Sequence, residues 1–304
     1  MTQRIIARSL VVLALALFTA TAAAAGSSYP SLRASGNMSL QRGLESALEN
    51  LGLATAAKAR KLAVALVDVT DPRRPRVATV NGDEMMYAAS LPKIAILLGA
   101  FERVAEGTLA LDDSVREQML RMIRYSSNSA ATFMLRKVGA PYLADVLRSP
   151  RYALYDEQYN GGLWVGKEYG KAAAWKRDPL HNLSHGATVM QIARFYYLLE
   201  TGRLVSPEAS REMKAILGDP GIHHKFVKGL ESNRPGSLIY RKSGSWASSH
   251  ADSAIIERDG RRYIAAALVN DARGGEWLSQ LIVALDDVIF QTPTQVAVSN
   301  APTR

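Results

Sequence analysis

Strand-like segments stand near both ends of the chain, on either side of a long helical middle. Leu62 to Val69 is a continuous apolar run, and Arg76 to Val80 follows it across a turn containing Asp71-Pro72. Strand patterns return after Pro235-Gly236, in 237–242, 251–257 and 262–269, with Asp259-Gly260 as a hairpin turn. Such distant strands share a core when one antiparallel sheet is assembled from both ends. The sequence therefore predicts an α+β fold with an inserted helical lobe.

Helical spacing of apolar residues fills the stretch between these strands and flanks it on both sides. We predict helices in 39–53, 94–104, 112–123, 129–138, 140–147, 189–199 and 276–290. The expected organisation is an α/β lobe from about 39–86 and 215–291 and an all-α lobe from about 87–214. Residues 291–304 are expected to form a loose tail.

The first residues have the pattern of a secretory signal. Arg4 and Arg8 precede an apolar run, and small residues follow up to Ala25. We expect cleavage near residue 25, a mature chain of 26–304 and a periplasmic or secreted location. A membrane anchor is the alternative, but the run is shorter than the roughly 20 residues that a span needs. No later segment is apolar enough to cross a bilayer.

Composition narrows the classes of chemistry. The chain has no Cys, which excludes disulfides, cysteine nucleophiles and thiolate metal sites. Its 48% hydrophobic content is ample for a large core, and its formal charge of +9 suits anionic surroundings such as cell-wall polymer or lipid headgroups. A merely soluble basic surface explains the charge equally well. Nucleic acid is disfavoured by the export signal and by the absence of a basic stripe with interleaved aromatics.

Ser90 and Lys93 form the only Ser-x-x-Lys sequence in the chain. They precede a long apolar helical segment, and Pro92 suits the start of a helix. A serine hydroxyl becomes a nucleophile when a nearby base takes its proton, and a lysine with a depressed pKa can do this. Ser90 N–H would be an oxyanion donor. The alternative to this catalytic interpretation is that Ser90 caps the helix and Lys93 is solvated.

Two further triplets follow in chain order. In Ser126-Ser127-Asn128, Ser126 could relay a proton to the leaving group and Asn128 could hold a substrate amide; helix capping is the alternative. In Lys242-Ser243-Gly244, the ammonium and the hydroxyl suit an anionic substrate, and the glycine permits close backbone approach. Ser245 N–H would be the second oxyanion donor. Taken by itself, the Lys242-Ser243-Gly244 triplet is equally explained as the ordinary end of a strand.

The ordered set resembles the penicillin-recognising serine enzymes, and specifically the class A β-lactamases. The resemblance extends from Leu62 to the last helix, and includes Asp68-Val69-Thr70 and the segment after Ala251. It implies a β-lactamase/transpeptidase-like fold. It also implies family roles for matching residues, which are Ser90, Lys93, Ser126, Asn128, Lys242, Ser243 and Gly244.

Two departures from that family stand out. Ser90 and Ser126 are only 36 residues apart, from 90 to 126, so a helical segment is missing and the cleft should be more open on that side. The loop that normally presents a water-activating Glu has no clean match between 152 and 183. Glu168 is ranked first for that role, ahead of Asp156 and Glu157. Each is otherwise an ordinary solvated carboxylate.

Other chemistry is weakly supported. His181 and His185 are four apart and His223 and His224 are adjacent, but they lie in loops without a third ligand, so no metal is expected. Trp164 and Trp246 are interpreted as core or cleft wall. No cofactor is implied, and the glycine pairs lack the setting of a phosphate loop.

The leading hypothesis is an exported serine hydrolase with an acyl-Ser90 intermediate. Its substrate would be a β-lactam, or a peptidoglycan-derived amide or ester that bears a carboxylate. Without a working deacylation group, the protein would be a D-alanyl-D-alanine peptidase, penicillin-binding protein or esterase with weak lactamase activity. A catalytically silent envelope binding protein is the rival from another class. The natural substrate and the oligomeric state stay open.

Overall fold

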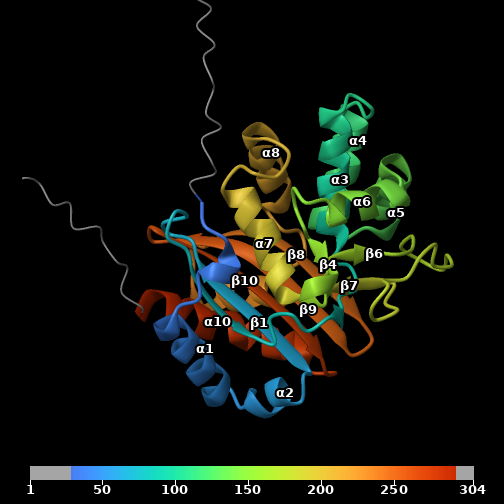
Figure 1. Ribbon diagram of the computed structural model, residues 1–304. Helices are drawn as coiled ribbons and strands as arrows, with labels where there is room; N and C mark the ends of the chain where they lie inside the picture. The colour runs from blue at the N-terminus through green and yellow to red at the C-terminus, as the bar shows by residue number, and fades with distance from the viewer. Residues whose placement is uncertain (1–28, 292–304) are drawn as a thin grey trace, which may run out of the picture.

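A five-stranded antiparallel sheet is the centre of the computed structural model, which describes residues 29–291 (Figure 1). Its strand order is β2-β1-β10-β9-β8, so strands from the two ends of the sequence lie side by side as the sequence predicts. The predicted signal segment and the tail beyond 291 lie outside the described residues. The strands of this sheet are β1 (Leu62–Asp68), β2 (Arg76–Val80), β8 (Leu238–Trp246), β9 (Ser249–Arg258) and β10 (Arg261–Asn270).

Two predicted boundaries differ from the structure by three residues or more, for local reasons. The strand predicted from residue 237 stops at Lys242, whereas β8 continues to Trp246, because the residues from Lys242 to Trp246 pair with Ser253 to Ser249 of β9. The first predicted helix runs to residue 53, whereas α1 ends at Asn50, just before Gly52 takes a positive φ of 68°. Strand pairing with β9 and the turn at Gly52 thus override the local sequence patterns.

One face of the sheet is covered by helices from the two ends of the chain. Figure 1 shows α1 and α10 together on this side. Leu44 and Leu48 from α1 and Leu281 and Leu285 from α10 are buried there in one apolar cluster with the sheet. The helices of this layer are α1 (Met38–Asn50), α2 (Ala54–Lys58), α9 (Phe226–Asn233) and α10 (Gly274–Gln291).

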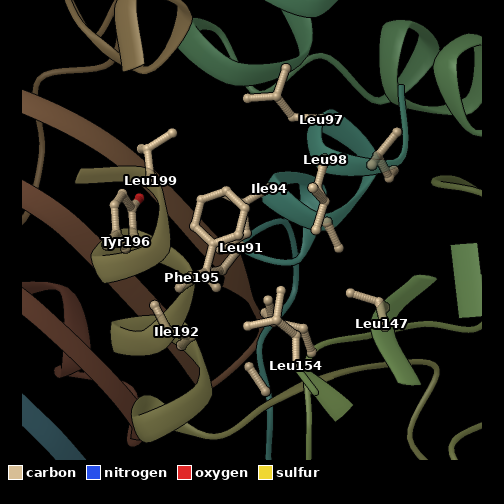
Figure 2. Packing of buried hydrophobic residues seen from close by; sticks show 14 of the residues in the cluster. Leu91, Ile94, Leu97, Leu98, Leu147, Leu154, Ile192, Phe195, Tyr196 and Leu199 are labelled. Atoms are coloured by element: carbon tan, nitrogen blue, oxygen red, sulfur yellow. The ribbon is translucent and has the colours of Figure 1, made fainter. Parts of the chain in front are cut away.

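The other face carries the helical middle of the chain, with α3 at its centre. Figure 2 shows Leu91 and Ile94 beside Phe195 of α7, and Leu97 and Leu199 belong to the same buried cluster. Because α3 is surrounded by apolar neighbours, the polar groups at its start are held in fixed positions. The helices of this layer are α3 (Lys93–Ala105), α4 (Asp113–Arg124), α5 (Asn128–Val138), α6 (Ala140–Arg148), α7 (Val189–Glu200) and α8 (Pro207–Leu217).

The sequence did not predict several short elements, and the short strands among them pack against α3, α6 and α7. Two small sheets have the orders β3-β7-β6 and β4-β5, and their two- and three-residue strands are too short to leave a periodic signal. No helix within residues 29–291 is long and apolar enough to span a membrane. The short elements are η1 (Leu32–Ala34), β3 (Met86–Tyr87), β4 (Tyr155–Asp156), η2 (Glu157–Tyr159), β5 (Gly161–Gly162), β6 (Trp164–Val165) and β7 (His185–Ala187).

Replacing Leu97 with alanine tests the packing of α3. The side chain is fully buried, so Leu97→Ala is expected to lower the free energy of unfolding by about 2–5 kcal/mol through lost transfer energy and a residual cavity. Chemical denaturation measures this. Met38, which is 76% exposed, provides the control, because Met38→Ala should change stability by no more than about 0.5 kcal/mol. Equal effects of the two variants would contradict the packing described here.

Candidate active site

Ser90 lies in the turn that leads from β3 into α3. Ala89, immediately before it, has a positive φ of 51°, which is unusual for a residue with a Cβ. The turn is closed by hydrogen bonds from Leu91 N to Ala88 O (3.0 Å) and from Lys93 N to Ser90 O (3.3 Å). The predicted position just before a helix is therefore correct, and the Ser90 side chain is half-buried.

Lys93 is fully buried in the first turn of α3. Its Nζ lies 2.6 Å from the carbonyl oxygen of Ser126, 2.8 Å from Asn128 Oδ1 and 3.4 Å from Ser126 Oγ. No carboxylate within residues 29–291 pairs with this ammonium. Burial therefore lowers the pKa of Lys93 to about 7. A neutral amine that donates to the two carbonyl-type oxygens keeps its lone pair for a proton.

Ser126 lies where the two lobes meet. Its backbone has a positive φ of 55°, and the following Ser127 caps α5 by accepting from Ala130 N. The capping role considered for this triplet thus belongs to Ser127. Ser126 Oγ lies 3.0 Å from Lys242 Nζ and 3.4 Å from Lys93 Nζ. The structure therefore brings the first, second and third motifs together around one hydroxyl.

Lys242 reaches this hydroxyl from β8. Its side chain is buried, and burial together with the nearby charges of Lys93 and Arg241 holds its pKa well below the usual value. Asp252 on β9 opposes that effect and forms a buried bidentate ion pair with Arg241, with both distances 2.7 Å. The neighbouring Ser243 hydroxyl lies 3.2 Å from His224 Nε2.

Gly244 brings β8 against the Ser90 turn. A Cβ at this position would lie 2.2 Å from Ala88 O and 2.8 Å from Ser90 N. Only glycine permits this approach, as the sequence predicts. Because Gly244 and Ser90 touch through their backbones, the N–H groups of Ser90 and Ser245 belong to two segments in direct contact.

The three carboxylates considered for activating water, Glu168, Glu157 and Asp156, each bind an arginine or a backbone N–H group. Both oxygens of Glu168 are held by Arg136, at 2.6 and 2.7 Å, and this pair lowers the pKa of Glu168. Glu157 pairs with Arg148, and Asp156 accepts from Gln158 N. A carboxylate neutralised by an arginine is a weak base, so these contacts argue against Glu168 as the group that activates water. That role for it stays a prediction.

Tyr169, the residue after Glu168, takes the place beside the buried lysine. Its ring centroid lies 4.5 Å from Lys93 Nζ, and the ring stacks on His185 at 4.3 Å. Thr132 Oγ1 holds the Tyr169 backbone through both its N–H (3.2 Å) and its carbonyl (3.1 Å). Sequence reasoning missed Tyr169, and its only signal was its position next to the predicted carboxylate.

The histidines and tryptophans have separate surroundings. His181 contacts Asn160, His223 contacts Glu231, and no cluster of three or more potential metal ligands occurs within residues 29–291. Trp164 is buried in the core, whereas Trp246 at the end of β8 is 69% exposed. Trp164 thus matches its predicted place, and Trp246 is not a core residue.

Comparison with known proteins identifies the family. The family model described as "Beta-lactamase enzyme family" matches residues 43–121 and 114–292. The chain belongs to this family. No curated protein matches it. The predicted resemblance to β-lactamase-like enzymes is confirmed.

Solved structures show the same fold at low sequence identity. A β-lactamase from Sphaerobacter thermophilus is 20% identical, with a TM-score of 0.64 over 83% of this chain and 99% of that one. A β-lactamase from Xanthomonas campestris pv. campestris is 18% identical, with a TM-score of 0.64 over 82% and 98%. A mutant of PBP-A, in an acyl-enzyme complex with penicillin G, is 18% identical, with a TM-score of 0.65 over 86% and 100%. The predicted β-lactamase/transpeptidase-like fold is therefore correct.

Adding a methyl group at Gly244 tests the contact between β8 and the Ser90 turn. Gly244→Ala is expected to lower stability by about 1–3 kcal/mol, because the new Cβ must push two backbone segments apart. It should also slow labelling by a fluorescent penicillin at least tenfold. Gly36, where a Cβ would meet nothing within 4 Å, is the control. If Gly244→Ala behaves like Gly36→Ala, the close approach is absent.

Proposed function

We propose that this protein is a serine acyl-transfer hydrolase that forms an acyl-enzyme at Ser90. The observation that carries the proposal is the convergence of Lys93 and Lys242 on Ser126. Lys242 lies on the same strand as Gly244, which packs against the Ser90 turn. A lysine whose pKa is lowered to about 7 can serve as a base near neutral pH. The substrate class is a β-lactam, or a peptidoglycan-derived amide or ester with a carboxylate.

The proposed acylation step assigns one role to each of these groups. Lys93 takes the hydroxyl proton of Ser90 as the oxygen attacks the substrate carbonyl, and the developing oxyanion accepts from the N–H groups of Ser90 and Ser245. Ser126, poised between the two lysines, passes a proton to the departing nitrogen. Asn128, Lys242 and Ser243 bind the polar groups of the substrate. The C–N bond breaks, and the acyl group remains on Ser90 as an ester.

Deacylation is proposed to be slow. The carboxylates suggested for activating water pair with arginines or backbone, and the aromatic ring of Tyr169 lies against Lys93. This favours a D-alanyl-D-alanine peptidase or penicillin-binding protein over a fast β-lactamase. A mutant of PBP-A, one of the structural neighbours, has a structure as an acyl-enzyme complex with penicillin G. Export to the periplasm and cleavage near residue 25 remain part of the proposal.

Covalent labelling by a fluorescent penicillin tests acylation and its pH dependence. The labelling rate should rise with pH up to about 7 and then level off, because only neutral Lys93 can accept the proton. Ser90→Ala should abolish the label, and Lys93→Met should slow it at least about 100-fold. A folded wild-type protein that takes up no label would favour the silent envelope binding protein and reject the proposal.

The predicted role of Glu168 has its own test. Because its carboxylate is paired with Arg136, Glu168→Gln is expected to leave both labelling and release of the label within about threefold of wild type. Release is followed by loss of fluorescence from the labelled protein after removal of free penicillin. Glu157→Gln is the matched control, since Glu157 also pairs with an arginine. Retained labelling with release slowed far more in Glu168→Gln would instead identify Glu168 as the deacylating base.

A further inference from the structure

The segment before α9 packs against β8 around the third motif. Arg241 donates to the carbonyl oxygens of Ile222 (2.9 Å) and His224 (3.2 Å). His224 in turn contacts the hydroxyl of Ser243, and Phe226 N donates to Asp252 at 3.1 Å. The strand that carries the third motif is therefore held in place by hydrogen bonds to this short polar segment.

Lys225 is the central residue of this segment and is 3% exposed. Its Nζ donates to Gly244 O at 2.5 Å, to Ser245 Oγ at 2.8 Å and to Ala251 O at 3.2 Å. These contacts account for the three protons of an ammonium group. Burial lowers the pKa of Lys225 only to about 8, with Asp252 opposing the decrease, so the group is charged at neutral pH.

The backbone of Lys225 has a strained conformation at the point where its side chain makes these hydrogen bonds. Its φ of 53° and ψ of −119° lie outside the regions that L-residues ordinarily occupy. Such a conformation costs on the order of 1–3 kcal/mol and persists only where surrounding contacts hold it. Ser279 Oγ of α10 supplies one of them by donating to Lys225 O at 3.0 Å.

The orientation of the Gly244–Ser245 peptide, whose carbonyl oxygen Lys225 contacts, relates Lys225 to the candidate active site. β8 is an edge strand, paired only with β9, and Lys225 reaches Gly244 O together with Ala251 O of β9. The Gly244 carbonyl therefore points toward β9. In a trans peptide the N–H points the opposite way, so the N–H of Ser245 points to the open edge. The Ser90 turn lies directly against this part of β8, because a Cβ at Gly244 would be 2.8 Å from Ser90 N.

We propose that Lys225 is a positioning residue that fixes and polarises the Gly244–Ser245 peptide, making the Ser245 N–H a stronger donor to the oxyanion formed at Ser90. The ammonium withdraws electron density from the amide through its carbonyl, and hydrogen bonds in series strengthen one another. A donor that is fixed before the reaction needs no reorganisation during it. The inference rests on the proposed acylation of Ser90.

The test compares Lys225→Met, Lys225→Arg and Lys228→Met. Methionine keeps the length of the side chain without the charge, and arginine keeps the charge. Lys228 lies three residues further on, in α9, and is exposed, so its variant controls for loss of one positive charge. Labelling with benzylpenicillin should be about tenfold slower in Lys225→Met, less than the roughly 10²–10³ lost when a whole oxyanion donor is removed. Lys225→Arg should recover most of the rate, and Lys228→Met should match wild type.

Infrared difference spectroscopy separates polarisation from simple structural support. With ¹³C at the β-lactam carbonyl, the ester band of the acyl-enzyme should move to higher wavenumber in Lys225→Met and return toward the wild-type position in Lys225→Arg. An unchanged band in Lys225→Met, or a slow rate that arginine does not rescue, would overturn the proposal.

A measurement on the free protein keeps the inference independent of acylation. In ¹⁵N–¹H spectra, the Ser245 amide proton should shift upfield in Lys225→Met and not in Lys228→Met. If wild type takes no penicillin but this shift occurs, the proposed function fails while the polarised peptide stands. An unshifted Ser245 amide in a folded variant rejects the role of Lys225 whatever the labelling shows.

Discussion

Two buried lysines that share one hydroxyl are the interaction on which the site depends. Lys93 and Lys242 both reach Ser126 Oγ, and neither side chain is more than 1% exposed. Two ammonium groups so close in a poorly polarisable interior are unfavourable together, because desolvation and repulsion both oppose charge. Their pKa values are therefore held down. This lowered pKa is what the proposed role of Lys93 as a base near neutral pH requires.

The architecture holds that unfavourable arrangement in place. Lys93 begins a helix whose apolar face is buried in the larger core cluster, and Lys242 lies on a strand that Arg241 and Asp252 anchor from behind. Gly244 lets that strand touch the Ser90 turn directly. Stability from the two apolar clusters thus offsets the cost of burying cations where the lobes meet.

Much of the fold could be predicted from sequence, because hairpins and amphipathic helices leave local periodic signals. The Asp259-Gly260 hairpin and the buried strand from Leu62 are examples. The loop that follows β6 could not be predicted, since its conformation depends on long-range contacts such as Thr132 with Tyr169 and Asp178 with Tyr155. For that reason sequence reasoning chose Glu168, while tertiary packing placed the neighbouring ring beside Lys93.

The sequence by itself determined the identities and the order of the proposed nucleophile, the two lysines and the close-approach glycine, because residue type alone carries their chemistry. Tertiary structure decided which groups meet. The pairing of Glu168 with Arg136, the ring of Tyr169 against Lys93 and the reach of Lys225 to Gly244 all join segments far apart in the chain. Such contacts follow from packing in three dimensions, which no local pattern of residues encodes.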